Sequence, residues 1–109
     1  MVFSVEEKGD VIIIRLDKRI DSSNADELEK GIEKIVKDGK KKILFDFSGT
    51  DYISSAGLRV LLLTVKNTKK TGGKVALCSL KPFVMEVFVT AGFNQIFSIY
   101  KTCDDGLAM

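Results

Sequence analysis

The sequence predicts an α/β fold with a mixed, mainly parallel β-sheet of about five strands and helices packed against it. Strand-like apolar runs alternate with segments whose apolar residues recur at helical spacing, in the order β-β-α-β-α-β-α-β. Only a short turn separates the first two strands, which predicts a hairpin. Each later strand follows a helix, which predicts parallel neighbours joined by right-handed crossovers. The length of 109 residues suits one domain, so we expect a single domain over residues 1–109.

The first 47 residues predict a hairpin, one helix and a central strand, in that order. Residues 2–5 alternate apolar and polar as in an edge strand, and after a Lys-Gly-Asp turn the run 11–16 is apolar and rich in β-branched residues. A helix then ends at Gly39, which suits the C′ position. The run 43–47 is almost continuously apolar, as in a strand covered on both faces. The apolar stripe of this helix would be Leu28, Ile32, Ile35 and Val36, and its capping box either Ser23 with Asp26 or Asn24 with Glu27.

A second helix and a further buried strand follow. The helix begins at Ser54 or Ser55 and ends at the Gly72-Gly73 pair, after which residues 75–78 form the strand. Lysines crowd the last turns of this helix, where cations complement the helix dipole. Its apolar stripe would be Leu58, Leu61, Leu62 and Val65.

The last third of the chain predicts a third helix, a short strand and a tail. Pro82 suits the first position of the helix, and Gly92 ends it. Residues 96–100 form the strand, and the tail 102–109 forms a short helical turn or frays. The buried face of the third helix would consist of Val84, Val87, Phe88 and Ala91.

Composition excludes most kinds of catalysis and of nucleic-acid binding. The chain contains no histidine, so a Ser-His-Asp triad, a Cys-His dyad and a histidine-ligated metal are impossible. Lys and Arg number 17 and Asp and Glu 15, and a net charge of only +2 is unsuited to neutralising nucleic-acid phosphates. No apolar run approaches the roughly 18 residues of a membrane-spanning helix. We expect no enzyme activity, no cofactor, no metal, no nucleic acid and no membrane.

The two cysteines are predicted to be reduced. Cys78 falls in a buried strand and is expected in the core, and Cys103, near the tail, is expected to be exposed. Their number and wide spacing do not suggest a disulfide framework, which favours a cytoplasmic protein.

The segment from 46 to 59 is the one most informative about function. It joins a central strand to a helix, where α/β proteins often place ligand and regulatory sites. Ser54 and Ser55 fall at the predicted helix N-terminus, whose free N–H groups and dipole stabilise a phosphate by about 0.3–1 kcal/mol. Ala56 and Gly57 are small and leave the first turn accessible. On this local chemistry alone, an ordinary N-cap is the favoured explanation of either serine, because serine is a standard cap residue.

The same segment resembles the signature of the STAS domain, the family of bacterial anti-sigma-factor antagonists. That signature is an acid-bearing strand, a short loop, an aromatic, an aliphatic, Asp-Ser, a small residue and Gly-Leu. The chain reads Tyr-Ile-Ser-Ser-Ala-Gly-Leu over 52–58. The leading hairpin, Arg-Ile-Asp at 19–21, Gly-Gly-Lys at 72–74 and residues 90–97 also fit the family. The resemblance therefore covers essentially the whole chain, and the expected fold is a single STAS domain.

The resemblance implies a non-enzymatic partner switch in the cytoplasm. An unphosphorylated antagonist binds an anti-sigma factor that is also a serine kinase of the histidine-kinase-like ATPase fold, and thereby frees the sigma factor. Phosphorylation ends the interaction, and a serine phosphatase resets it. The phosphorylated serine aligns with Ser55, with Ser54 as the second choice, and the family's loop acid aligns with Asp21, beside the phosphosite. The expected partner-binding residues are Asp21, Ser54, Ser55, Ala56, Gly57, Leu58 and Arg59.

Two departures from the family pattern keep an alternative open. Ser54 stands where an acid is common, which removes a carboxylate beside the phosphosite. Arg59 occupies a position that is often small, where it could border the contact surface or shield a phosphate. The alternative is a STAS scaffold or accessory subunit of a larger signalling or transport assembly that serine phosphorylation does not switch. A switch protein is expected to be a monomer or a weak dimer.

Overall fold

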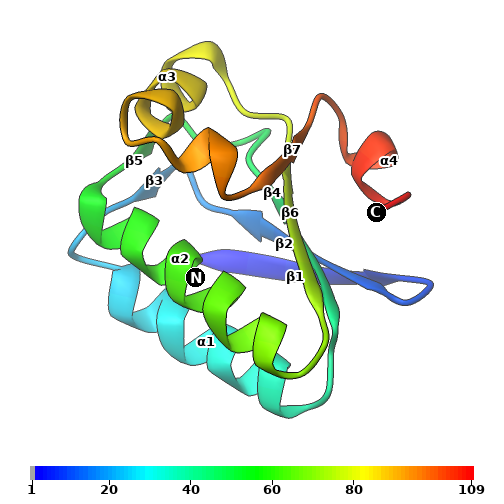
Figure 1. Cartoon of the computed structure of the whole chain (residues 1–109). Helices are drawn as coiled ribbons and strands as arrows, with labels where there is room; N and C mark the ends of the chain where they lie inside the picture. Colours follow the sequence, from blue (N-terminus) through cyan, green and yellow to red (C-terminus); the bar gives the residue numbers. More distant parts are fainter. Residues whose placement is uncertain (1) are drawn as a thin grey trace.

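The computed structural model describes residues 2–109 and contains a five-stranded sheet with the strand order β1-β2-β4-β6-β7 (Figure 1). β1 and β2 form an antiparallel hairpin, and every other neighbouring pair is parallel. The predicted mixed, mainly parallel sheet is therefore confirmed. The strands are β1 (Phe3–Lys8), β2 (Val11–Leu16), β4 (Lys42–Asp46), β6 (Lys74–Cys78) and β7 (Ser98–Tyr100).

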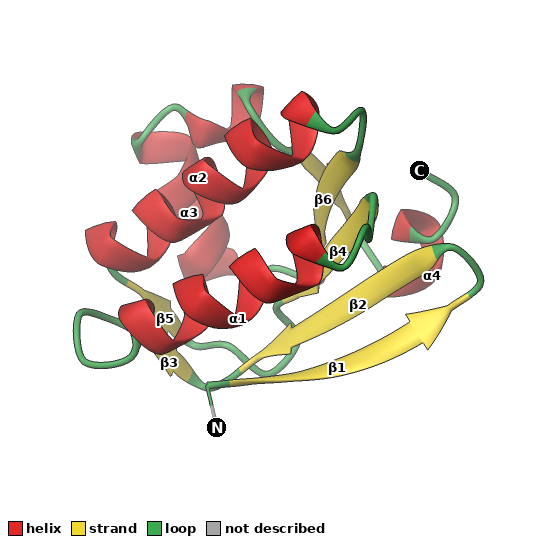
Figure 2. Cartoon of the chain, turned by 90° about the horizontal axis from the view of Figure 1, so that it is seen from below, coloured by secondary structure: helices red, strands yellow, loops and turns green. Residues whose placement is uncertain are grey.

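Three helices cover one face of the sheet, and a fourth lies on the opposite face (Figure 2). We call the first the front face and the second the back face. On the front lie α1 (Ala25–Lys37), α2 (Ser55–Lys70) and α3 (Pro82–Thr90), and a short 3₁₀ turn, η1 (Phe93–Gln95), follows α3. The back face carries α4 (Cys103–Gly106), so the predicted helical turn of the tail is confirmed.

Alternation along the strands produces two cores of different size. Successive residues of a strand point to opposite faces. In β4, Ile43 and Phe45 join the front core between sheet and helices, whereas Leu44 belongs to the back cluster. The front core also holds Phe47, Phe88 and Phe97, whose rings meet edge-on in two pairs. The large front core therefore holds the fold together, and the back face has only a thin cover.

The buried face of α2 is rotated relative to the predicted stripe. Leu62 is 38% exposed, whereas Val60, Thr64 and Thr68 are buried. The cause is packing against α1, which turns this flank of α2 inward. Thr64 is tolerated there because its hydroxyl donates to the Val60 carbonyl, 2.9 Å away.

Two smaller sequence predictions fail for local reasons. Asn24 is the N-cap of α1, but its side chain makes no capping hydrogen bond, because its oxygen accepts from the Asp21 N–H and its amide donates to the Arg19 carbonyl. No capping box forms. Ala91 is exposed because it follows the last residue of α3, just before Gly92 with its positive φ of 76°.

The expectation of two reduced cysteines is wrong. Cys78 and Cys103 form a disulfide, with their Cα atoms 5.2 Å apart. β7 pairs with the buried end of β6 and returns the chain to it, so residue 103 arrives beside residue 78. The spacing of the two cysteines in the sequence does not reveal that they are neighbours in space.

Candidate functional site

A short strand pair brings the two loops of the predicted site together. β3 (Arg19–Ile20) and β5 (Tyr52–Ile53) form a parallel two-stranded sheet that the sequence pattern did not reveal. The Ser54 N–H continues this pairing by donating to the Ile20 carbonyl, 2.9 Å away. Asp21 follows Ile20 directly, so the loop acid lies beside the start of α2.

The loop between β4 and β5 is fastened to the carboxyl end of the sheet. The Phe47 N–H donates to the Cys78 carbonyl, and the Asp51 N–H donates to the Lys18 carbonyl, at 3.0 and 2.8 Å. Thr50 is fully buried, and its hydroxyl lies 2.9 Å from the Asp17 carbonyl and 3.3 Å from that of Leu16. The start of α2 therefore sits on a rigid support.

The two adjacent serines have different surroundings. Ser54 is the N-cap of α2, and its half-buried hydroxyl accepts from the Gly57 N–H at 3.4 Å. Ser55 is the first residue of the helix and is exposed, and its hydroxyl makes no hydrogen bond within residues 2–109. Ser54 is therefore engaged in the fold, whereas the Ser55 hydroxyl is available to a reagent from outside.

Gly57 lets the first turn of α2 lie against the β3–β5 pair. A Cβ at this position would come within 2.8 Å of the Ile20 Cγ2 and of the Ile53 Cγ1. Leu58 points into the front core, whereas Arg59 is exposed on the next turn. Of the predicted contact residues, Ser55 and Arg59 are exposed, and the buried Gly57 and Leu58 position them. The other three, Asp21, Ser54 and Ala56, are half-buried.

Paired charges surround the helix start. Hydrogen bonds from the Ser23 hydroxyl and N–H hold the pKa of Asp21 below its ordinary value, and Arg19 lies 3.6 Å away. The hydrogen bond from Lys81 likewise lowers the pKa of Asp51. Both carboxylates therefore have cationic partners. The first turn of α2 itself contains no acid to occupy the positive end of the helix dipole.

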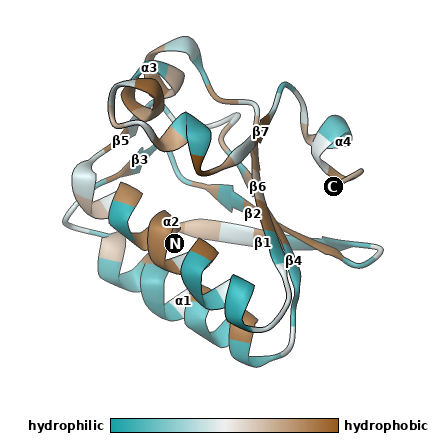
Figure 3. Cartoon of the chain, viewed as in Figure 1, coloured by the Kyte–Doolittle hydropathy of each residue, from teal (hydrophilic) through white to brown (hydrophobic). Residues whose placement is uncertain are grey.

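An apolar groove begins at Ser55 and runs between α2 and α3. Its volume is about 380 Å³, and we call it the α2–α3 groove. Phe83 stands at its edge with 60% of its surface exposed. α3 is mostly hydrophobic, in contrast to the largely hydrophilic α1 (Figure 3). This groove was not predicted from the sequence, because the apolar residues of α3 were expected to lie in the core. The residues lining it are Ser55, Leu58, Phe83, Glu86, Val87, Thr90 and Ala91.

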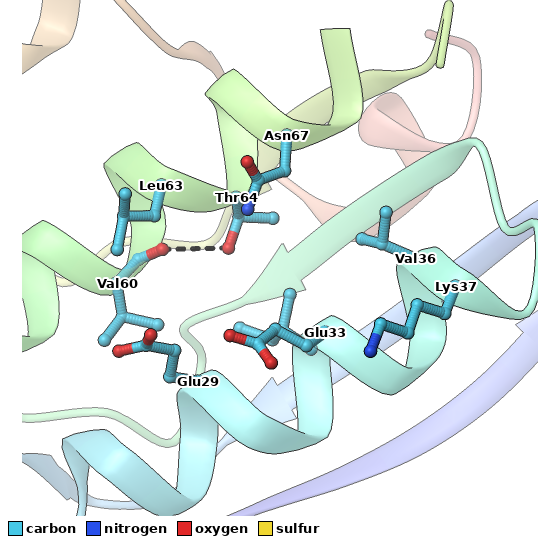
Figure 4. A pocket seen from close by; sticks show the side chains of 9 residues that line it. Glu29, Glu33, Val36, Lys37, Val60, Leu63, Thr64 and Asn67 are labelled. Atoms are coloured by element: carbon cyan, nitrogen blue, oxygen red, sulfur yellow. Dashed lines mark hydrogen bonds between the residues drawn. The ribbon is translucent and has the colours of Figure 1, made fainter. Parts of the chain in front are cut away.

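A second hollow lies between α1 and α2 and has fewer features of a binding site (Figure 4). It measures about 270 Å³, and the carboxylates of Glu29 and Glu33 lie at its border. The hydroxyl of Thr64 is already bonded to the Val60 carbonyl. The hollow is a seam between two packed helices and contains none of the predicted site residues.

Comparison with known proteins identifies the family. The model of the STAS domain matches residues 2–106 of the chain. The chain belongs to the STAS domain family. BtrV of Bordetella bronchiseptica, whose name places it among the anti-sigma factor antagonists, is 38% identical over 99 residues, which are 91% of this chain and 85% of that protein.

Solved structures of STAS proteins share the fold over nearly the whole chain. A crystal structure from Thermotoga maritima, whose name also places it among the anti-sigma factor antagonists, superposes with a TM-score of 0.92. It is 26% identical and covers 97% of this chain and 92% of that one. The Bacillus cell fate determinant SpoIIAA, in its phosphorylated form, gives a TM-score of 0.77 at 18% identity, with 97% and 96% covered, which shows the common fold.

This STAS protein therefore belongs to the anti-sigma factor antagonists, which are non-enzymatic regulators, and its family implies an anti-sigma factor as partner. The predicted family and the predicted lack of enzyme activity are confirmed by this membership. Within residues 2–109, no helix is both long and apolar enough to cross a membrane.

Proposed function

We propose that this STAS protein is a partner switch controlled by phosphorylation of Ser55. Unphosphorylated, it binds an anti-sigma factor that is also a serine kinase of the histidine-kinase-like ATPase fold, and it frees the sigma factor. The phosphorylated form does not bind. The observation that carries the proposal is the exposed, unbonded Ser55 hydroxyl at the first residue of α2, a helix of 16 residues.

A phosphate on Ser55 suits the fold of the isolated protein. It adds about −1.5 to −2 charges at pH 7. The first turn of α2 has free N–H groups and no acid, which stabilises such a charge by about 0.3–1 kcal/mol. Arg59 lies four residues further along the same helix and can approach the phosphate. Phosphorylation therefore leaves the domain folded.

The same phosphate opposes binding of a partner. A partner that covers the start of α2 would also cover the apolar α2–α3 groove, which is bordered by Ser55 and Glu86. A dianion at this place would have to lose water against a surface built for a neutral hydroxyl. Arg59 offsets only part of its charge, and burying the remainder without a cation from the partner costs several kcal/mol. Binding would fall by roughly two orders of magnitude or more, because each 1.4 kcal/mol is a factor of ten.

Reversal requires a serine phosphatase, and the exposure of Ser55 supports access by one. Sigma factors act in the bacterial cytoplasm, so we propose that location for this protein as well. Of the residues predicted to contact the partner, Ser55 and Arg59 are exposed. Asp21 is half-buried and directly follows Ile20, whose carbonyl accepts from the Ser54 N–H. We propose these three, with the walls of the α2–α3 groove, as the contact surface.

The first test is capture of partners from lysate of the source organism. Wild type, Ser55→Ala and Ser55→Asp serve as parallel baits, with Lys66→Arg, at an exposed position about three turns further along α2, as the control. We expect wild type, Ser55→Ala and the control to retain an ATPase-fold kinase that Ser55→Asp loses. Phosphorylation by the captured kinase should be absent in Ser55→Ala. If all baits capture the same proteins and none of these is kinase-like, the proposed switch is refuted.

Sedimentation velocity separates the switch from the scaffold alternative. A chain of 12.0 kDa that sediments as a monomer or weak dimer fits a switch. A stable large homo-assembly, unchanged by Ser55→Asp, would instead favour a scaffold or accessory subunit.

A further inference from the structure

The disulfide joins the C-terminal helix to the end of a central strand. Cys78 is the last residue of β6 and is fully buried, whereas Cys103 is the first residue of α4 and is half-buried. The two residues are 25 positions apart. Of the two cysteines, Cys103 is therefore the one on the solvent side of the bond.

α4 is the helix that covers the back face of the sheet (Figure 2). Gly106 of this helix lies so close to Leu44 of β4 that a Cβ would come within 2.7 Å of the Leu44 Cδ1. The cover fits closely, but it is small. The strand residues beneath it are Val11, Ile13, Leu44, Ala76 and Cys78, and the covering residues are Tyr100, Cys103, Leu107 and Met109.

Noncovalent forces alone hold α4 weakly. It has four residues, and helices this short are not stable by themselves in water. Its N-cap, Thr102, accepts a hydrogen bond from the Asp105 N–H at 3.1 Å, which is a contact within the same segment. None of the ion pairs among residues 2–109 involves α4. The disulfide is therefore the strongest restraint on its position.

We propose that Cys78 and Cys103 form a reversible redox site, opened by a low-molecular-weight thiol of the glutathione class, that controls docking of α4 on the back face. The proposal is independent of the Ser55 switch. It draws support from the cytoplasmic location proposed above, because disulfides in reducing compartments are mostly transient or regulatory. Cys103 is half-buried and Cys78 is fully buried, so the attack is directed at the Cys103 sulfur.

Opening consumes two thiols and transfers two electrons. A glutathione thiolate attacks the Cys103 sulfur, the S–S bond breaks, and Cys78 leaves as a thiolate that takes up a proton. A second glutathione thiolate attacks the mixed disulfide, releases the Cys103 thiolate, which is also protonated, and forms glutathione disulfide. The protein gains two electrons and two protons, and two glutathione molecules supply them. Closure is the reverse reaction with glutathione disulfide as the oxidant.

The test uses the full chain at equilibrium with reduced and oxidised glutathione in varied ratio, without air. Free thiols are trapped with iodoacetamide and counted by intact mass. We expect molecules with either no label or two labels. Hydrogen exchange of residues 101–109 should be about tenfold faster or more in the reduced protein, while the front-face helices stay unchanged. Cys103→Ser should reproduce the fast exchange under oxidising conditions, and Ala108→Ser, exposed in the same segment, should not.

Three results would overturn the proposal. Both cysteines could be labelled even with glutathione disulfide alone, which would mean that no bond forms. Exchange of residues 101–109 could be equal in oxidised and reduced protein, which would mean that the bond does not control α4. The reduced protein could also bind a metal ion that a chelator removes, because Asp46, Cys78 and Cys103 place ligand atoms within 4.8 Å of one another. This would mean that the two cysteines serve as metal ligands and not as a redox site.

Discussion

Replacing Gly57 by alanine should destabilise the protein at its regulatory site. The added Cβ would meet the Ile20 Cγ2 and the Ile53 Cγ1, both at 2.8 Å, where an ordinary contact is about 3.4 Å or longer. Both isoleucines are buried and β-branched, so neither side chain can move away freely. Overpacking of this kind costs about 1–3 kcal/mol, and alanine regains about 1 kcal/mol of helix propensity. The net expectation is a loss of up to about 2 kcal/mol.

Gly31→Ala is the matched control, because Gly31 also lies inside a helix and also lacks room for a Cβ. The obstacle there is the ring end of Phe3, a half-buried side chain on the edge strand that can swing toward solvent. The gain in helix propensity from alanine should then nearly cancel the energetic cost of the close contact with Phe3. Urea denaturation of both variants measures the difference. If Gly57→Ala is as stable as Gly31→Ala, the close docking of α2 on the β3–β5 pair is not a constraint, and the argument fails.

Further predictions concern the residues around Ser55. Ser54→Asp should change the free energy of unfolding by no more than about 0.5 kcal/mol, since aspartate and serine cap helices equally well. This variant should also still bind the captured kinase, which Ser55→Asp does not. If both variants lose binding equally, the position of the charge is irrelevant. Thr50→Val should cost about 0.5–1.5 kcal/mol by chemical denaturation, because the Asp17 carbonyl loses the hydroxyl donor that lies 2.9 Å away; a neutral effect would show that the loop relaxes. Lys81 lowers the pKa of Asp51, so this pair stabilises the fold fully above pH 3.8, the ordinary value, and progressively less as the pH falls below it. The Tm difference between wild type and Asp51→Asn should shrink correspondingly, and a difference that grows toward low pH would contradict the pairing.

The main sheet and its helices could be predicted because their signals are long. Each central strand is an apolar run bounded by turn residues, and α1 repeats its apolar residues over three turns. β3 and β5 have two residues each, too few for any period, so their pairing emerges only when the two loops meet in space. The disulfide was missed for the same reason, since it depends on the pairing of β6 with β7.

The position of the candidate site could be predicted from the sequence, but not which of the two serines caps the helix and which is free. The sequence placed both serines at a helix start and left the cap undecided. The decision depends on the Ser54 N–H, which bonds to the Ile20 carbonyl and fixes where the helix begins. The α2–α3 groove was invisible because an apolar residue on a short helix is normally assigned to the core, and only the packed structure leaves Phe83 outside it.

Separation of cap and switch onto adjacent residues explains how a modification here can change binding without unfolding. Losing an N-cap costs about 1 kcal/mol, so a phosphate that replaced the cap would disturb α2 itself. Ser54 keeps the cap through its bond from the Gly57 N–H, and the Ser55 hydroxyl remains free of any structural duty within the described chain. The charge added at Ser55 acts on whatever covers the helix start, and the domain beneath it is unchanged. An acid at position 54 would serve the cap equally well, so serine at this position preserves the fold and alters only the charge beside the proposed phosphorylation site.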